Sequence, residues 1–320
     1  MQSALRGLLS AFGLALAAST AAAQDIKIGV AGPITGPLAF LGQHIKWAGD
    51  LATDEINRKG GVLGRKLVFL MQDSACRPGD GVTAAERLLN QDRVDVMLGD
   101  VCSGSTMAVM PVMEKAQRPF IVTISTHPDI TAKSGVGGNR WVFRTVPHDG
   151  MIADVVADKM KGFKSIAIVG EDTDYGRGAV RLLKERLPAS VRIVSEDYLK
   201  QTETDFLPIL TRIRASKPDA IGTYVLDQQA SNLMRQYLQF GLSMPLVGRP
   251  PLGSGVVAEL VKTGKFDGSW TVYPYYDKFD DPKNEEEEAL YATIRRRLAE
   301  TPGWFSKVKN NIRGVSEETT

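Results

Sequence analysis

Metal-binding residues are scarce in this chain of 320 residues, which holds two cysteines and three histidines. A metal site needs three or four such ligands close together, whereas His44, His127 and His148 are scattered. Charge of one sign is also scarce, because the formal net charge is +2 and the basic residues are spread along the chain. We therefore predict no metal, no cofactor and no nucleic-acid partner.

The motifs of common enzyme classes are absent as well. The chain has no Gly-x-Ser-x-Gly turn, no Gly-x-x-x-x-Gly-Lys-Ser/Thr loop, no His-Glu-x-x-His and no complete Gly-x-Gly-x-x-Gly at its first strand. His127 could reach a cleft, but a single histidine before Pro128 is more typical of a structural hydrogen bond. We predict a protein that is not an enzyme, with a hydrolase as one alternative.

The first 23 residues have the pattern of a secretory signal peptide. Arg6 gives a basic start, residues 8–18 form a short apolar run, and the small residues before Gln24 allow cleavage near Ala23. No cysteine follows the apolar run, which argues against a lipoprotein signal. No later stretch approaches the roughly 20 apolar residues that span a bilayer. We expect an exported protein in the periplasm.

The two cysteines, Cys76 and Cys102, each follow an apolar strand. In an oxidising compartment this placement predicts a disulfide. Two free buried thiols are the alternative.

Short apolar runs alternate with amphipathic stretches along most of the chain. The predicted strands of the first half are 26–31, 66–71, 94–98 and 119–124, and those of the second half are 165–170, 191–194, 220–226 and 245–248. Such alternation is typical of a parallel sheet covered by helices on both faces. We predict an α/β fold of two doubly wound parallel-sheet lobes joined by a hinge. Residues 24–145 form lobe 1 and residues 146–272 form lobe 2.

One stretch, residues 95–107, suggests a binding site. The strand ends at Gly99, and a helix is expected from about Thr106. Ser103 and Ser105 then lie where the free N–H groups and the positive dipole end of a helix face solvent, which favours a bound carboxylate. The alternative is that one serine only caps the helix.

Several motifs together resemble the substrate-binding proteins of ABC importers for branched-chain amino acids, the type I periplasmic binding proteins. They are IGVAGPITGP at 28–37, DEIN at 54–57, GGVLGR at 60–65, DSAC at 73–76, LGDVCSGST at 98–106, FRT at 143–145 and DYGRG at 174–178. The resemblance covers residues 26 to about 280. It implies a monomer that captures a ligand between two lobes and delivers it to a permease in the membrane.

The resemblance also implies site residues. A ligand carboxylate would be held by Ser103 and by Thr126, with Ser125 beside it, and Tyr175 of the second lobe would close over the ligand. Apart from the resemblance, we expect Phe40 and Leu41 to form an apolar wall, which suits an aliphatic or aromatic side group.

The chain departs from the family pattern where the ligand's ammonium group would be recognised. The expected acid aligns near Pro250, where no acid stands, and a second tyrosine of the pattern is replaced by Leu226. Asp227 could replace the acid, whereas Arg249 would favour a second carboxylate or an acid without an amino group. Amino acids and related organic acids both remain candidates.

A ligand-sensing receptor lobe that acts on a signalling partner is the other alternative function. The last stretch, residues 273–320, is expected to return to lobe 1 and to be incomplete through truncation, with a naturally shortened variant as the alternative. It offers one amphipathic helix at 285–300, with Leu290, Ile294 and Leu298 on one side, and no later strand signal. This predicts low stability and weak ligand binding.

Overall fold

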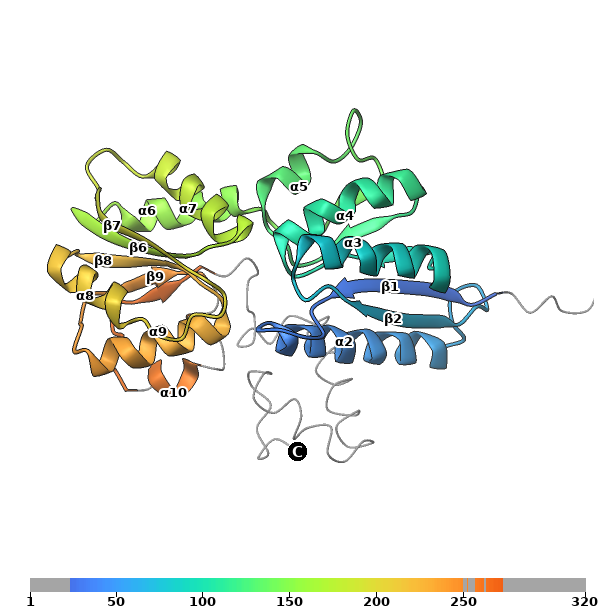
Figure 1. The fold of residues 1–320 in the computed structure, drawn as a ribbon, viewed down its shortest axis with the longest axis horizontal. Helices are drawn as coiled ribbons and strands as arrows, with labels where there is room; N and C mark the ends of the chain where they lie inside the picture. Colours follow the sequence, from blue (N-terminus) through green and yellow to red (C-terminus); the bar gives the residue numbers. More distant parts are fainter. Residues whose placement is uncertain (1–23, 250–251, 253–256, 262, 273–320) are drawn as a thin grey trace, which may run out of the picture.

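The computed structural model describes residues 24–249, 252, 257–261 and 263–272 (Figure 1). The predicted signal peptide and the predicted return segment, residues 1–23 and 273–320, lie outside the described residues. Within the described part, no helix is long and apolar enough to cross a membrane.

Lobe 1 is built on a parallel sheet with the strand order β2-β1-β3-β4-β5. Its strands are β1 (Ile26–Gly32), β2 (Leu67–Asp73), β3 (Val96–Leu98), β4 (Phe120–Val122) and β5 (Val142–Arg144). The helices are α2 (Ala39–Arg58), α3 (Pro78–Arg87) with the π-helical turn η1 (Leu88–Asp92), α4 (Ser103–Ala116) and α5 (Pro128–Ala132). In Figure 1, α3 and α4 lie on one side of the sheet and α2 lies on the other.

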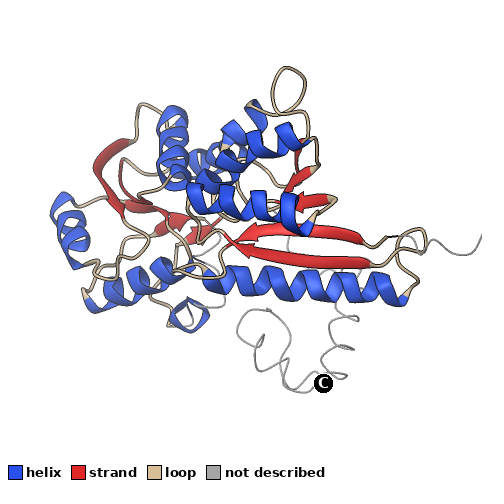
Figure 2. Cartoon of the chain, turned by 45° about the vertical axis from the view of Figure 1, so that its right-hand side comes forward, coloured by secondary structure: helices blue, strands red, loops and turns tan. Residues whose placement is uncertain are grey.

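Lobe 2 repeats this design with the strand order β10-β9-β8-β6-β7, again all parallel. Its strands are β6 (Ser165–Glu171), β7 (Arg192–Leu199), β8 (Ala220–Tyr224), β9 (Leu246–Gly248) and β10 (Trp270–Thr271). The helices are α6 (Asp149–Met160), α7 (Asp174–Arg186), α8 (Leu207–Ser216), α9 (Asp227–Gln239) and the short α10 (Ala258–Val261). In Figure 2 the helices of this lobe lie above and below its strands.

Strand β6, which lies between β8 and β7, shows why an apolar run becomes such a sheet, because all seven of its residues are buried. Ala167 and Val169 belong to a core with α8 and α9, while Ile166 and Ile168 belong to a second core with α6 and α7. Successive side chains of a strand point to opposite faces, so an unbroken apolar run requires cover on both. The predicted fold class, two parallel-sheet α/β lobes, is confirmed.

One helix start differs from the sequence expectation. Helix α4 begins at Ser103 rather than at Thr106. Helix α7 begins at Asp174, the first residue of the DYGRG motif. Thr173 caps α7, because its hydroxyl accepts a hydrogen bond from the backbone N–H of Gly176 at 3.2 Å. Ser103 and Tyr175 are therefore fixed in the first turns of helices rather than in loops.

Strand β5 pairs with β4 and forms the edge of the lobe-1 sheet, so it belongs to lobe 1 and not to the connection between the lobes. The chain passes to lobe 2 in the short segment between Arg144 and Asp149. Because all strands are parallel, their carboxyl ends in each lobe meet at one edge of the sheet.

Candidate ligand-binding cleft

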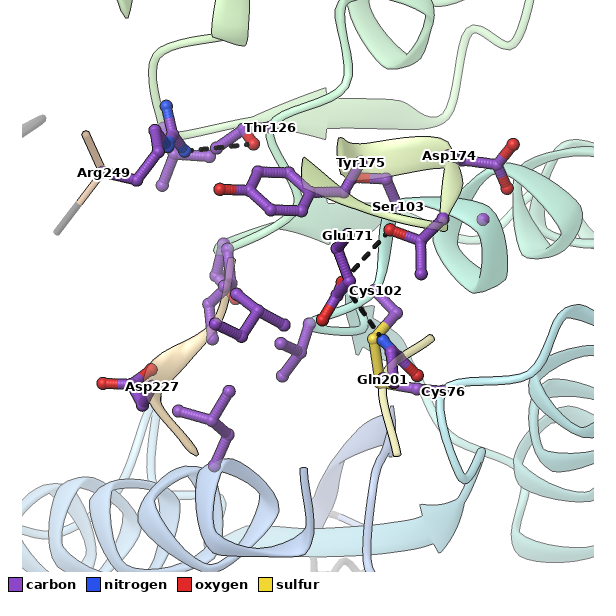
Figure 3. A pocket seen from close by; sticks show the side chains of 18 of the residues that line it. Cys76, Cys102, Ser103, Thr126, Glu171, Asp174, Tyr175, Gln201, Asp227 and Arg249 are labelled. Atoms are coloured by element: carbon purple, nitrogen blue, oxygen red, sulfur yellow. Dashed lines mark hydrogen bonds between the residues drawn. A yellow bond between two sulfur atoms is a disulfide. The ribbon is translucent and has the colours of Figure 1, made fainter. Parts of the chain in front are cut away.

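A cavity of about 450 Å³ lies between the two lobes, at the carboxyl ends of both sheets (Figure 3). This volume suits a small organic molecule. Both lobes contribute to its wall. The lining residues are Leu41, Cys76, Pro78, Val101, Cys102, Ser103, Gly104, Thr123, Ile124 and Thr126 from lobe 1, and Val146, Glu171, Thr173, Asp174, Tyr175, Gln201, Leu226, Asp227 and Arg249 from the remainder of the chain.

The amino-terminal end of α4 forms one side of the cavity. Ser103 is the first residue of this helix and only 3% exposed, and the N–H of Thr106 donates the first bond of the helix to the carbonyl of Cys102. The N–H groups before Thr106 precede that ladder, so this end of the helix carries unused donors and a partial positive charge. Such an end favours an anion in the cavity.

Thr126 and Ser125 follow β4 but play different parts. Thr126 lines the cavity, and its hydroxyl accepts a hydrogen bond from Arg249 Nη2 at 3.4 Å. The Ser125 hydroxyl points inward, donates to the carbonyl of Asp100 at 2.7 Å and lies 2.6 Å from the Thr106 hydroxyl. Ser125 is not among the lining residues and braces the loop behind Ser103, so we do not keep it as a ligand contact.

Cys76 and Cys102 form the predicted disulfide, with their Cα atoms 5.3 Å apart. Cys76 and Ala75 both have positive φ, at 57° and 43°, which is unusual for residues with a side chain. Asp73 supports this turn, because its carboxylate accepts hydrogen bonds from the N–H groups of Ala75 and Ile34, both at 2.8 Å. Burial alone would raise the pKa of Asp73, but these bonds and those from Thr35 hold it below its usual value.

Arg249, from the end of β9, is 6% exposed, and its Nη1 lies 3.0 Å from Oδ1 of Asp149. Asp149 is 1% exposed at the start of α6. Burial raises the pKa of the Asp149 carboxyl, and the Arg249 guanidinium opposes this shift. The guanidinium also lies 5.5 Å from the centre of the Tyr175 ring. No sequence pattern indicates this buried pair, because an acid at a helix start is common for other reasons.

Glu171, the last residue of β6, is a second buried acid and is 1% exposed. Its Oε2 accepts hydrogen bonds from the Thr173 hydroxyl at 3.1 Å and from Gln201 Nε2 at 3.4 Å. Burial raises the pKa of Glu171 to about 7, although both hydrogen bonds favour the ionised form. Sequence reasoning missed Glu171, because an acid at a strand end is usually solvated.

The other predicted residues also reach the cavity. Leu41, Leu226 and Ile124 give it apolar surface, and Asp227 lines it from the start of α9. Phe40 is not among the lining residues, and its ring packs edge-on against that of His44 with centroids 6.0 Å apart. The structure thus brings together Ser103, Thr126, Tyr175, Asp227, Leu41 and Arg249, but not Ser125.

His127 has a structural role. Its Nδ1 accepts a hydrogen bond from the N–H of Asp129 at 3.2 Å and so caps α5. Its ring also touches lobe 2, because a methyl group added at Gly178 would lie 2.7 Å from His127 Cδ2. The two lobes are therefore in contact beside the cavity.

Two parallel α/β lobes that enclose one cavity define a two-lobed binding protein. The sequence profile of the periplasmic binding protein family matches residues 25–306, and the chain belongs to this family. This family consists of solute-binding proteins rather than enzymes.

The chain is 32% identical over 226 residues to an amino acid binding protein of Pseudomonas aeruginosa, a match that covers 70% of this chain and 60% of the relative. It is also 32% identical over 248 residues to the Leu/Ile/Val-binding protein BraC3 of Rhizobium johnstonii, covering 76% of this chain and 66% of that one. The matched part thus spans somewhat less than two thirds of the length of these relatives.

Solved structures share the fold. A solute-binding protein of an ABC transporter from R. palustris, crystallised with benzoate, aligns with a TM-score of 0.75 at 25% identity, covering 86% of this chain and 74% of that one. The branched-chain amino acid binding protein LivJ of Streptococcus pneumoniae, crystallised with isoleucine, aligns with a TM-score of 0.74 at 23% identity, covering 87% and 78%.

Proposed function

We propose that this protein captures a small carboxylate-bearing ligand, an amino acid or a related organic acid, between its lobes and delivers it to an ABC importer in the membrane. The proposal rests mainly on the amino-terminal end of α4, where Ser103 and unused N–H donors face an enclosed cavity. The names of the relatives support the ligand class, since they bind amino acids or benzoate.

The proposal includes export. The signal pattern of residues 1–23 supports cleavage near Ala23 and a periplasmic location, where the Cys76–Cys102 disulfide is stable. We further propose that the protein acts as a monomer and that the permease is its partner.

Because both lobes line the cavity, a ligand that touches both would shift the protein towards a closed form. Thermal unfolding of the purified protein with aliphatic and aromatic amino acids, and with the same acids lacking the amino group, would test this. A ligand at ~100 times its dissociation constant stabilises by about 2.7 kcal/mol. We expect at least one acid to raise the midpoint of thermal unfolding and to reduce the protein's radius of gyration in solution. A panel without any binding acid would contradict the proposed function.

A further inference from the structure

We propose that Glu171 is the group that receives the ligand's ammonium, so that the site selects amino acids over the same acids without the amino group. This inference rests on the proposed function and deepens it, because it assigns the second polar contact of the same cleft.

The first support is the position of Glu171. The side chain is 1% exposed, lines the cavity, and is held by Thr173 and Gln201 through one oxygen, Oε2. In Figure 3 the other carboxylate oxygen is directed into the space that the labelled side chains enclose. A buried acid whose described hydrogen bonds come from neutral donors lacks a countercharge, and a ligand ammonium would supply one.

The second support is the charge balance of the cavity. Among the described lining residues, Arg249 is the one cation, and Asp149 at 3.0 Å already balances its charge. The other charged lining residues, Glu171, Asp174 and Asp227, are all acidic. A ligand that brings only a carboxylate would add negative charge to the cavity, whereas an amino acid brings a cation with its anion.

The third support is the arrangement of these groups around the cavity. Arg249 and Glu171 both act on Tyr175, whose pKa burial raises to about 12, with Arg249 opposing the shift and Asp149 and Glu171 adding to it. Figure 3 shows Arg249 and Glu171 on either side of the Tyr175 ring, and Ser103 and Glu171 line the same cavity from opposite lobes. A small amino acid could place its carboxylate near Ser103 and its ammonium at Glu171.

Asp227 is the rival for this role. Figure 3 shows its carboxylate directed away from Tyr175 and Glu171. Its charge acts on His44 of α2, where burial lowers the histidine pKa and Asp227 opposes that shift. Asp227 is only half-buried, whereas Glu171 is buried.

The test uses matched acid pairs, L-leucine with 4-methylpentanoate and L-phenylalanine with 3-phenylpropanoate, titrated by calorimetry into the wild type and Glu171→Gln. We expect the wild type to prefer the amino acid of at least one pair by tenfold or more. Glu171→Gln should lower the affinity for that amino acid at least tenfold. It should change the affinity for the deaminated partner less than about threefold. At pH 7, binding of the amino acid should release protons in the wild type but not in the variant, because Glu171 must ionise.

Two further variants keep the result interpretable. Glu185 is an exposed glutamate of α7 paired with Arg181, and Glu185→Gln should leave the affinities for both acids unchanged. Asp227→Asn tests the rival. An equal loss of affinity for the amino acid and its deaminated partner in Glu171→Gln would indicate a structural role and overturn the proposal. The proposal would also be overturned if only Asp227→Asn lost the preference for the amino acid, or if the wild type bound the deaminated acids as tightly as the amino acids. Either result would leave the proposed capture of a carboxylate intact. If the wild type bound neither these acids nor any acid of the wider panel, the result would instead contradict the proposed function.

Discussion

The two walls of the cleft differ in their chemistry. The lobe-1 wall offers neutral donors, the hydroxyls of Ser103 and Thr126 and the N–H groups at the start of α4. The wall from the rest of the chain carries the charged side chains, among them Glu171 and Arg249. A neutral wall at a helix end can hold any carboxylate, so selection among carboxylates must come from the charged wall.

The largest effect is expected on the charged wall, from Arg249→Met. This change leaves Asp149 buried without its partner, which costs about 3–5 kcal/mol of stability. Urea unfolding measures the loss, and adding Asp149→Asn to the variant should restore much of it. Arg181→Met, which removes an exposed ion pair, should cost less than about 1 kcal/mol. A similarly small loss in Arg249→Met would show that the buried pair contributes little.

The neutral wall depends on the disulfide that holds its loop. Replacing both Cys76 and Cys102 by serine removes a link across 26 positions, which in the chain-entropy model costs about 3–4 kcal/mol. The unfolding midpoint should fall, and affinity for a carboxylate should fall with it because the loop of Ser103 loosens. Two free thiols titrated in the unfolded, unreduced wild type would contradict the premise.

Glu171 should make the charged wall sensitive to pH. Its pKa is about 7 in the folded protein and about 4.5 when unfolded, so between these values the folded state binds more protons. Stability should therefore fall as the pH rises from about 4.5 to about 7, by up to about 3 kcal/mol from this group. Glu171→Gln should flatten the profile in that window and be more stable than the wild type at pH 8. Identical profiles for the two proteins would argue against a buried, uncompensated Glu171.

On the neutral wall, Ser103→Ala should remove one charge-assisted hydrogen bond to the ligand. The expected loss is about 1.5–3 kcal/mol, or roughly ten- to more than a hundredfold in affinity. Ser216→Ala is the control, because that hydroxyl donates to the carbonyl of Ile213 at the end of α8, away from the cleft. Equal affinities of Ser103→Ala and the wild type would remove Ser103 from the site.

The same contrast explains what the sequence could predict. Apolar runs report burial directly, so the parallel sheets and the position of Ser103 beside a helix start followed from the pattern. The direction of a side chain does not follow from it. Ser125 turns inward and donates to the carbonyl of Asp100, and this pairing joins residues 25 positions apart in the chain. Glu171 and Asp149 were missed for a related reason, because acids at element ends are usually solvated and only tertiary packing buries them.

The most direct test of the central claim, that the neutral wall holds the charge of a carboxylate, is a calorimetric comparison of the tightest-binding acid with its primary amide. A charge-assisted hydrogen bond is about twice as strong as a neutral one. We expect the amide to bind the wild type at least about tenfold more weakly than the acid, and we expect this difference in affinity to be smaller in Ser103→Ala. An amide that binds as tightly as the acid would contradict this claim.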